Sequence, residues 1–96
     1  MLEKLTHEAF TERIGEQMEF ELADIHFSAI TDEVTTMPQQ PGQQRVPFSV
    51  IFQALGDDNH GQHLYQARHP QMGEFPIFLV PIGPGEKGMR YEAVFN

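Results

Sequence analysis

A two-residue period dominates this chain from Gly15 onward. Apolar and polar side chains alternate in six short segments, at residues 18–22, 25–29, 48–54, 65–68, 75–80 and 91–95. A period of two is typical of strands that bury one face, and several such segments separated by Gly and Pro favour a small antiparallel architecture. The sequence therefore predicts a mainly β fold of about six antiparallel strands, arranged as a small sandwich or a partly closed barrel.

The residues before Gly15 carry the pattern of one short N-terminal α-helix. Thr6 is a suitable N-cap, and Leu5 with Phe10 matches a hydrophobic staple. Gly15 is a suitable stop for this helix. A helix of about two turns is unstable alone, so we expect it to dock on the sheet through Phe10 and Ile14.

The connections between the predicted strands differ in kind. The short stretch 71–73 follows His69-Pro70 and predicts a hairpin with Gly at its bend. Residues 83–88 form a longer Gly/Pro turn, and residues 56–61 form a polar loop. The stretch 35–45 holds two prolines and four glutamines without an apolar period, so we expect a mobile loop there.

The inward positions of the strands supply the predicted core: Phe20, Leu22, Ile25, Phe27, Phe48, Val50, Phe52, Tyr65, Ile77, Leu79, Tyr91 and Phe95. The last strand runs almost to Asn96, and a chain that stops inside an apolar strand usually ties that strand into the fold. We therefore expect one complete domain over residues 1–96, which closes through its C-terminus.

Charge and composition exclude several classes of function. Fourteen acidic residues against six basic ones give a formal net charge of −8, and the basic residues are scattered. Nucleic acids and anionic membrane surfaces are therefore poor partners. The absence of cysteine excludes disulfides, thiol catalysis and thiolate metal sites. Without a signal segment or a long apolar stretch, we expect no membrane insertion and a cytoplasmic protein, or one exported or assembled without a cleaved signal.

No group of residues forms a convincing catalytic or metal motif. His60 and His63 in the polar loop are suitable zinc ligands, but His-x-x-His without a partner motif is more often a solvated turn. The acidic pair Glu19 and Glu21 lies on an outward strand face, where carboxylates are usually solvated. Ser28 lies in no nucleophile elbow. We therefore predict no catalytic residue, no cofactor and no metal ligand.

A second apolar face is the most suggestive functional feature. Four apolar residues point away from the predicted core: Ile51, Phe78, Val80 and Val94. Exposed apolar patches usually mark contacts with other molecules, so these residues form a candidate interaction surface for a protein partner or for self-association. The alternative is that the N-terminal helix covers them, through Leu2, Leu5, Phe10 and Ile14.

Five motifs carry a resemblance: Leu5-Thr6-His7-Glu8 followed by Phe10, Pro47-Phe48-Ser49 with Phe52, His69-Pro70 followed by Gly73, Phe78-Leu79-Val80-Pro81-Ile82-Gly83-Pro84, and Tyr91-Glu92-Ala93-Val94-Phe95-Asn96. The chain resembles a family of small bacterial domains of unknown function. The resemblance implies no catalytic or cofactor residues. It associates similar proteins with phage-tail-like, tail-collar-type neighbours, which favours an assembly or accessory role.

Three classes of function follow from these observations. The first is a non-catalytic structural or protein-interaction module. The second is a small β-barrel that binds a small apolar ligand in its Phe-rich interior, although ten aromatic residues favour a filled interior. The third is a metal-dependent enzyme built on His60 and His63. The first is our leading prediction.

Overall fold

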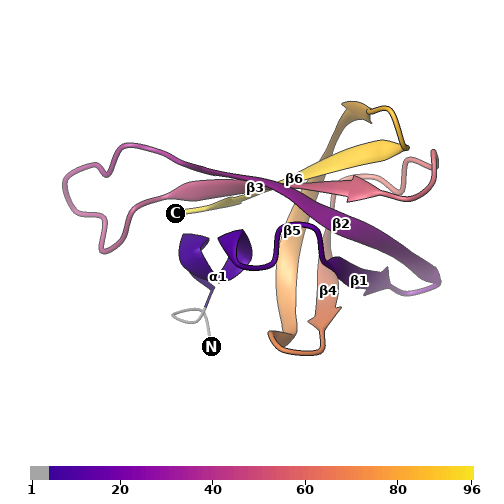
Figure 1. The fold of residues 1–96 in the computed structure, drawn as a ribbon, viewed down its shortest axis with the longest axis horizontal. Helices are drawn as coiled ribbons and strands as arrows, with labels where there is room; N and C mark the ends of the chain where they lie inside the picture. The colour runs from indigo at the N-terminus through magenta and orange to yellow at the C-terminus, as the bar shows by residue number, and fades with distance from the viewer. Residues whose placement is uncertain (1–4) are drawn as a thin grey trace.

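The structure is a computed structural model that describes residues 5–96. Its elements are α1 (His7–Thr11), β1 (Gln17–Leu22), β2 (Ile25–Thr36), β3 (Phe48–Ala54), β4 (His63–His69), β5 (Gly73–Pro84) and β6 (Met89–Phe95) (Figure 1). The six strands form a closed antiparallel barrel in the order β1-β2-β3-β6-β5-β4. The predicted fold class is confirmed, and of the two architectures the barrel is correct. In the described part of the chain, no helix has the length and apolar character needed to cross a membrane.

Every strand pairs with two neighbours, and the antiparallel pairing of β1 with β4 completes the closed barrel. The two long strands, β2 and β5, divide their length between their neighbours. β2 pairs with β1 over Ile25–Ile30 and with β3 over Ala29–Thr36. β5 pairs with β4 over Gly73–Leu79 and with β6 over Val80–Pro84. Each long strand also has a register irregularity, near the middle of β2 at Thr31–Glu33 and near the end of β5 at Pro81–Gly83, and such a bulge increases the local twist. Figure 1 accordingly shows β4 and β5 running at a steep angle to β3 and β6, with β1 alongside the end of β2.

The bulge in β2 explains why this strand is longer than predicted. Thr31 faces the core and is fully buried, whereas Asp32 and Glu33 are both exposed. The apolar–polar alternation is therefore broken, and the sequence signal ends at Ala29. Beyond the bulge, β2 stays paired with β3 as far as Thr36. The connection to β3 therefore begins after Thr36, not at Thr35 as predicted.

Most of the predicted core is buried inside the barrel. Eight of the twelve predicted residues are buried: Phe20, Phe48, Val50, Phe52, Tyr65, Ile77, Leu79 and Tyr91. The other four are partly buried and pack against that cluster: Leu22, Ile25, Phe27 and Phe95. Leu22 and Ile25 flank the β1–β2 turn, and Phe95 ends β6, so these side chains lie at the openings of the barrel. The prediction missed Phe75, Met18 and Met89, which are also buried.

The short helix closes one end of the barrel. The Phe10 ring is fully buried, with its centroid 5.3 Å from Phe95, 6.0 Å from Phe48 and 6.2 Å from Phe75. These neighbours belong to the core, so the expectation that the helix covers the second apolar face is wrong. Ile14 does not dock and is 47% exposed. Leu2, which was assigned to the same contact, lies outside the described residues.

The predicted N-cap of the helix is correct, but its end is not. The Thr6 hydroxyl accepts a hydrogen bond from the Ala9 N–H at 3.2 Å. The helix ends at Thr11, and turns continue the chain to Gly15 at φ +92°. The Gly15 N–H then donates to the Thr31 carbonyl at 2.8 Å, which ties the turn to β2. The helix therefore ends four residues before Gly15, with Arg13 and Ile14 in i→i−3 turn bonds to the Phe10 and Thr11 carbonyls.

Candidate functional site

The opposite end of the barrel is closed by the loop between β3 and β4. The Tyr91 hydroxyl donates to the Asp58 carbonyl at 3.2 Å and accepts from the His60 N–H at 3.0 Å. The Tyr65 hydroxyl donates to the Gly61 carbonyl at 2.7 Å. Two core tyrosines therefore hold this polar loop over the barrel. With α1 at the other end and aromatic rings between, the described side chains occupy the interior, which does not favour the predicted apolar-ligand alternative.

His60 in the loop and His63 at the start of β4 both contact aromatic rings. The His60 ring stacks on Phe27, with centroids 4.6 Å apart and planes at 14°. The His63 ring stands edge-on to Tyr65, at 5.7 Å. Within residues 5–96, no three His, Cys, Asp or Glu residues converge in a way that could hold a metal ion. The geometry therefore gives the metal-enzyme hypothesis no support.

The buried tyrosines make the barrel sensitive to alkali. Burial raises the pKa of Tyr65 from 10.0 to about 12 and also raises the pKa of Tyr91. Because the pKa of Tyr65 is higher in the folded than in the unfolded state, the buried protonated phenol contributes stability that is fully present below pH 10, the unfolded-state pKa. This contribution is lost as the pH rises toward about 12. We expect the free energy of unfolding to fall across this range, less steeply in Tyr65→Phe. Denaturant titrations at several pH values measure both slopes, and equal slopes would exclude Tyr65 as the cause.

A polar cluster on the outside of the β1–β2 hairpin surrounds Glu19. Gln17 and Ser28 donate hydrogen bonds to its carboxylate at 2.8 and 2.7 Å, and His26 lies 3.4 Å away. The Gln17 bond, followed by those of Ser28 and the nearby cations, lowers the pKa of Glu19 despite partial desolvation. Ser28 donates to the Glu19 carboxylate, which Gln17 also binds, so the hydrogen bond of this hydroxyl ties β2 to β1.

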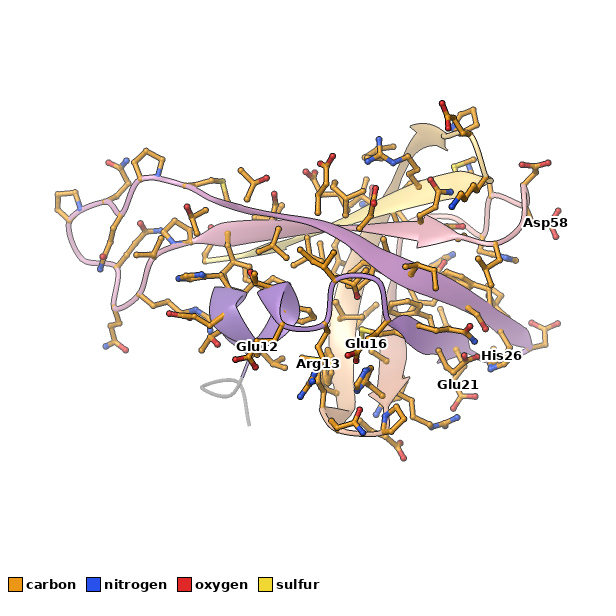
Figure 2. The ribbon with its side chains drawn as sticks, viewed as in Figure 1. Glu12, Arg13, Glu16, Glu21, His26 and Asp58 are labelled. Carbon is orange, nitrogen blue, oxygen red and sulfur yellow. The ribbon has the colours of Figure 1, made fainter. Side chains whose placement is uncertain are left out.

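The predicted neighbour Glu21 serves a different contact. It lies opposite His26 in the β1–β2 register, and Figure 2 shows the two residues close together at the hairpin. Its carboxylate accepts a hydrogen bond from Arg68 at 2.8 Å. Glu19 and Glu21 therefore engage different partners, Glu19 within the hairpin and Glu21 across to β4.

A second polar cluster joins the turn after α1 to the β4–β5 hairpin. His69 is 3% exposed, and its Nδ1 accepts the N–H groups of Gln71 and Met72 at 3.0 and 3.3 Å. This leaves Nε2 to donate to Glu16, 2.7 Å away. Glu16 also lies beside Arg13, at 3.9 Å (Figure 2). All of the ring's hydrogen-bonding capacity is thus used to brace the hairpin.

The outer apolar face is the remaining candidate, and the structure changes its membership. Leu64 lies directly opposite Phe78 in the β4–β5 register, and the two side chains are 59% and 48% exposed. Val80 is half-buried two residues further along β5, and Val94 on β6 is 53% exposed. We call Leu64, Phe78, Val80 and Val94 the outer patch.

Ile51 belongs to the same outer face but contributes little surface. It lies between Glu33 and Glu92 in the strand register and is only 8% exposed. The prediction that Ile51 is an accessible part of the surface is therefore wrong. Leu64 was missed, although its outward position follows from its alternation with the inward Tyr65.

One carboxylate lies within the outer patch. Glu92 is half-buried and stands opposite Val80 on one side and Ile51 on the other. Among the described residues its side chain makes no hydrogen bond or ion pair. Arg90, on the same face of β6, is directed toward Asp32 and Glu33, at 3.4 and 3.9 Å.

A groove of about 420 Å³ lies beyond Arg90, where the turn before β6 folds over β2 and β3. Ile30 and Leu55 form its apolar part, and Asp32, Gln53 and Arg90 form much of its polar part. Asp32 and Arg90 pair with each other, and Gln53 donates to the Gly88 carbonyl at 2.8 Å. These polar groups support the turn, while Leu55 remains 56% exposed at the edge.

Comparison with known proteins places the chain in a family without assigning it an activity. No curated protein and no solved structure matches it. The model of one family, described as a domain of unknown function (DUF6916), matches residues 5–95. That range includes every strand of the barrel and the helix that closes it. The chain therefore belongs to the DUF6916 family of domains of unknown function.

Proposed function

We propose that this chain is a non-catalytic protein-interaction module that binds a protein partner through the outer patch. The observation that carries the proposal is the pair Leu64–Phe78, two large apolar side chains that face each other across β4 and β5 and remain about half exposed. Folding does not require them there, because the barrel interior is already filled. Contiguous exposed apolar residues usually mark contacts with other molecules.

The polar clusters support a non-catalytic role. Catalytic groups generally retain a free position for substrate, whereas His69 uses both ring nitrogens within the fold. Ser28 donates to a carboxylate that Gln17 also binds. Both clusters therefore serve the fold, since one braces a hairpin and the other joins β1 to β2.

The proposed setting is an accessory role in a phage-tail-like or surface assembly of a bacterium. The motif resemblance described above suggests this setting. A small rigid barrel with one apolar patch suits such a role, because it can bind one component without a moving part. Products of genes adjacent to this one are the natural candidates for the partner.

Capture of purified neighbouring gene products by the immobilised protein tests the proposal. A Phe78→Ser variant should weaken capture at least about tenfold, since a hot-spot residue at the centre of an interface contributes about 2 kcal/mol or more. Leu55→Ser is the matched control, because Leu55 is similarly exposed but lies outside the patch. Unchanged unfolding midpoints must accompany both variants. Equal capture by Phe78→Ser and wild type, or no capture of any product, would contradict the proposal.

A further inference from the structure

We infer that the partner presents a basic side chain to Glu92, flanked by apolar side chains that cover the outer patch. This inference rests on the proposed function and adds the chemistry of the partner to it. The occupant is thus a cationic, apolar protein segment. It is neither a purely hydrophobic surface nor a second copy of this chain.

The first reason to expect a basic side chain in the partner is the position of Glu92. Its carboxylate stands between Val80 and Ile51, with Val94 two residues along the same strand. Any partner that covers Val80 and Val94 removes water from this carboxylate. Burial of an unpaired charge is strongly unfavourable, so a purely apolar surface would bind poorly. A Lys or Arg side chain at this point supplies the missing counter-charge.

The second reason to expect a basic partner is the charge around the outer patch. Arg90 on one side of the patch is already directed to Asp32 and Glu33. Arg68 on the other side pairs with Glu21 and Glu74, at 2.8 and 3.7 Å. These two arginines are therefore engaged by four carboxylates, and the whole chain carries −8. Such a field attracts a basic partner and accelerates its association at low salt.

The same charges disfavour a second copy as the occupant. In a twofold symmetric dimer, each subunit would use the same patch, so two Glu92 carboxylates would enter one interface. In each subunit Arg68 and Arg90 are already engaged by carboxylates of the same chain, so they are not available to neutralise the Glu92 of the other subunit. Two chains of −8 would also repel each other at long range.

A pair of small probes tests the inference without knowledge of the partner. The octylammonium ion and the octanoate ion share an apolar tail and differ in the sign of the head group. In an amide NMR titration at low ionic strength, below micelle formation, octylammonium should shift the signals of Phe78, Val80, Glu92 and Val94 saturably. Glu92→Gln should weaken this binding about fivefold, the effect of one partly exposed charge pair. Octanoate should shift these signals far less.

Glu12→Gln is the matched control, because it removes one carboxylate from an exposed position just after α1 (Figure 2). If Glu92→Gln and Glu12→Gln weaken octylammonium equally, net charge alone is responsible and the inference fails. It also fails if octanoate binds as well as octylammonium, or if wild type gives no saturable shifts. Light scattering that gives twice the 11.0 kDa monomer mass, reduced to the monomer by Phe78→Ser, would identify a second copy instead.

The effects of two variants on capture of the partner distinguish this inference from the proposed function. Phe78→Ser tests the patch, whereas Glu92→Lys tests the charge and should weaken capture more than Glu92→Gln. If Phe78→Ser abolishes capture and Glu92→Lys leaves it unchanged, the inference fails and the proposed function stands. If neither variant changes capture, both fail.

Discussion

Truncation of Phe10 to alanine should lower the free energy of unfolding by about 3–5 kcal/mol. The ring is fully buried and lies 5.3–6.3 Å, centroid to centroid, from four core phenylalanines on β3, β5 and β6. Its removal would leave a cavity at the end of the barrel that the short helix alone fills. Against a typical total of about 5–15 kcal/mol, the loss would nearly unfold the domain. Denaturant unfolding followed by circular dichroism measures it.

Ile14→Ala is the matched control for Phe10→Ala. Sequence periodicity placed Ile14 on the same docking face, but its side chain is 47% exposed. Its truncation should change the free energy of unfolding by less than about 0.5 kcal/mol, as expected for an exposed site. If both truncations have similar effects, or if Phe10→Ala is nearly neutral, the helix does not close the barrel as described.

This role of the helix bears on where the protein can act. Phe10 closes one end of the barrel, and the loop held by Tyr65 and Tyr91 closes the other. A barrel that is filled and closed at both ends leaves its outer wall as the surface for recognition. Because α1 contributes to the core, it cannot also cover the outer patch. The filled interior and the exposed patch are thus consequences of the same packing.

Much of the fold could be predicted because the strand period is strong. The segments at 48–54 and 91–95 match β3 and β6 closely, since each strand keeps one face inward over its whole length. The second half of β2 could not be predicted, because the bulge at Asp32 breaks the alternation. Closure of the barrel also escaped prediction, since pairing between distant strands depends on tertiary register and leaves no local signal.

The candidate surface was predicted in part for a related reason. Alternation indicates that Phe78, Val80 and Val94 point outward, and the structure leaves them exposed or half-buried. Alternation cannot indicate what long neighbouring side chains cover, so Ile51 was wrongly counted as accessible. The place of Glu92 between Val80 and Ile51 depends on the β3–β6 and β5–β6 registers, which one strand's sequence does not contain.

Substitution of Gly88 by alanine should destabilise the protein by about 3 kcal/mol or more. Gly88 has φ +144°, and a Cβ there would overlap the Gly56 carbonyl oxygen and lie 2.9 Å from the Ala54 carbonyl oxygen. Both obstacles are backbone atoms, which cannot move aside as a flexible side chain can. The neighbouring Met89 N–H donates to Gly56 at 2.9 Å, so a shift would break the contact that fixes the start of β6. Chemical denaturation measures the change.

Two glycine controls separate the causes of the Gly88→Ala effect. Gly56→Ala should be nearly neutral, because a Cβ there meets no atom within 4 Å and the backbone is not in the left-handed region. At Gly83 φ is +110°, but a Cβ would meet no atom within 4 Å. Gly83→Ala should therefore lower the free energy of unfolding only by the cost of the left-handed backbone, about 1–2 kcal/mol. If Gly88→Ala costs no more than Gly83→Ala, the turn can move away from β3. The close approach at Gly56 would then not be what fixes the start of β6, the strand that carries Glu92 and Val94 to the outer patch.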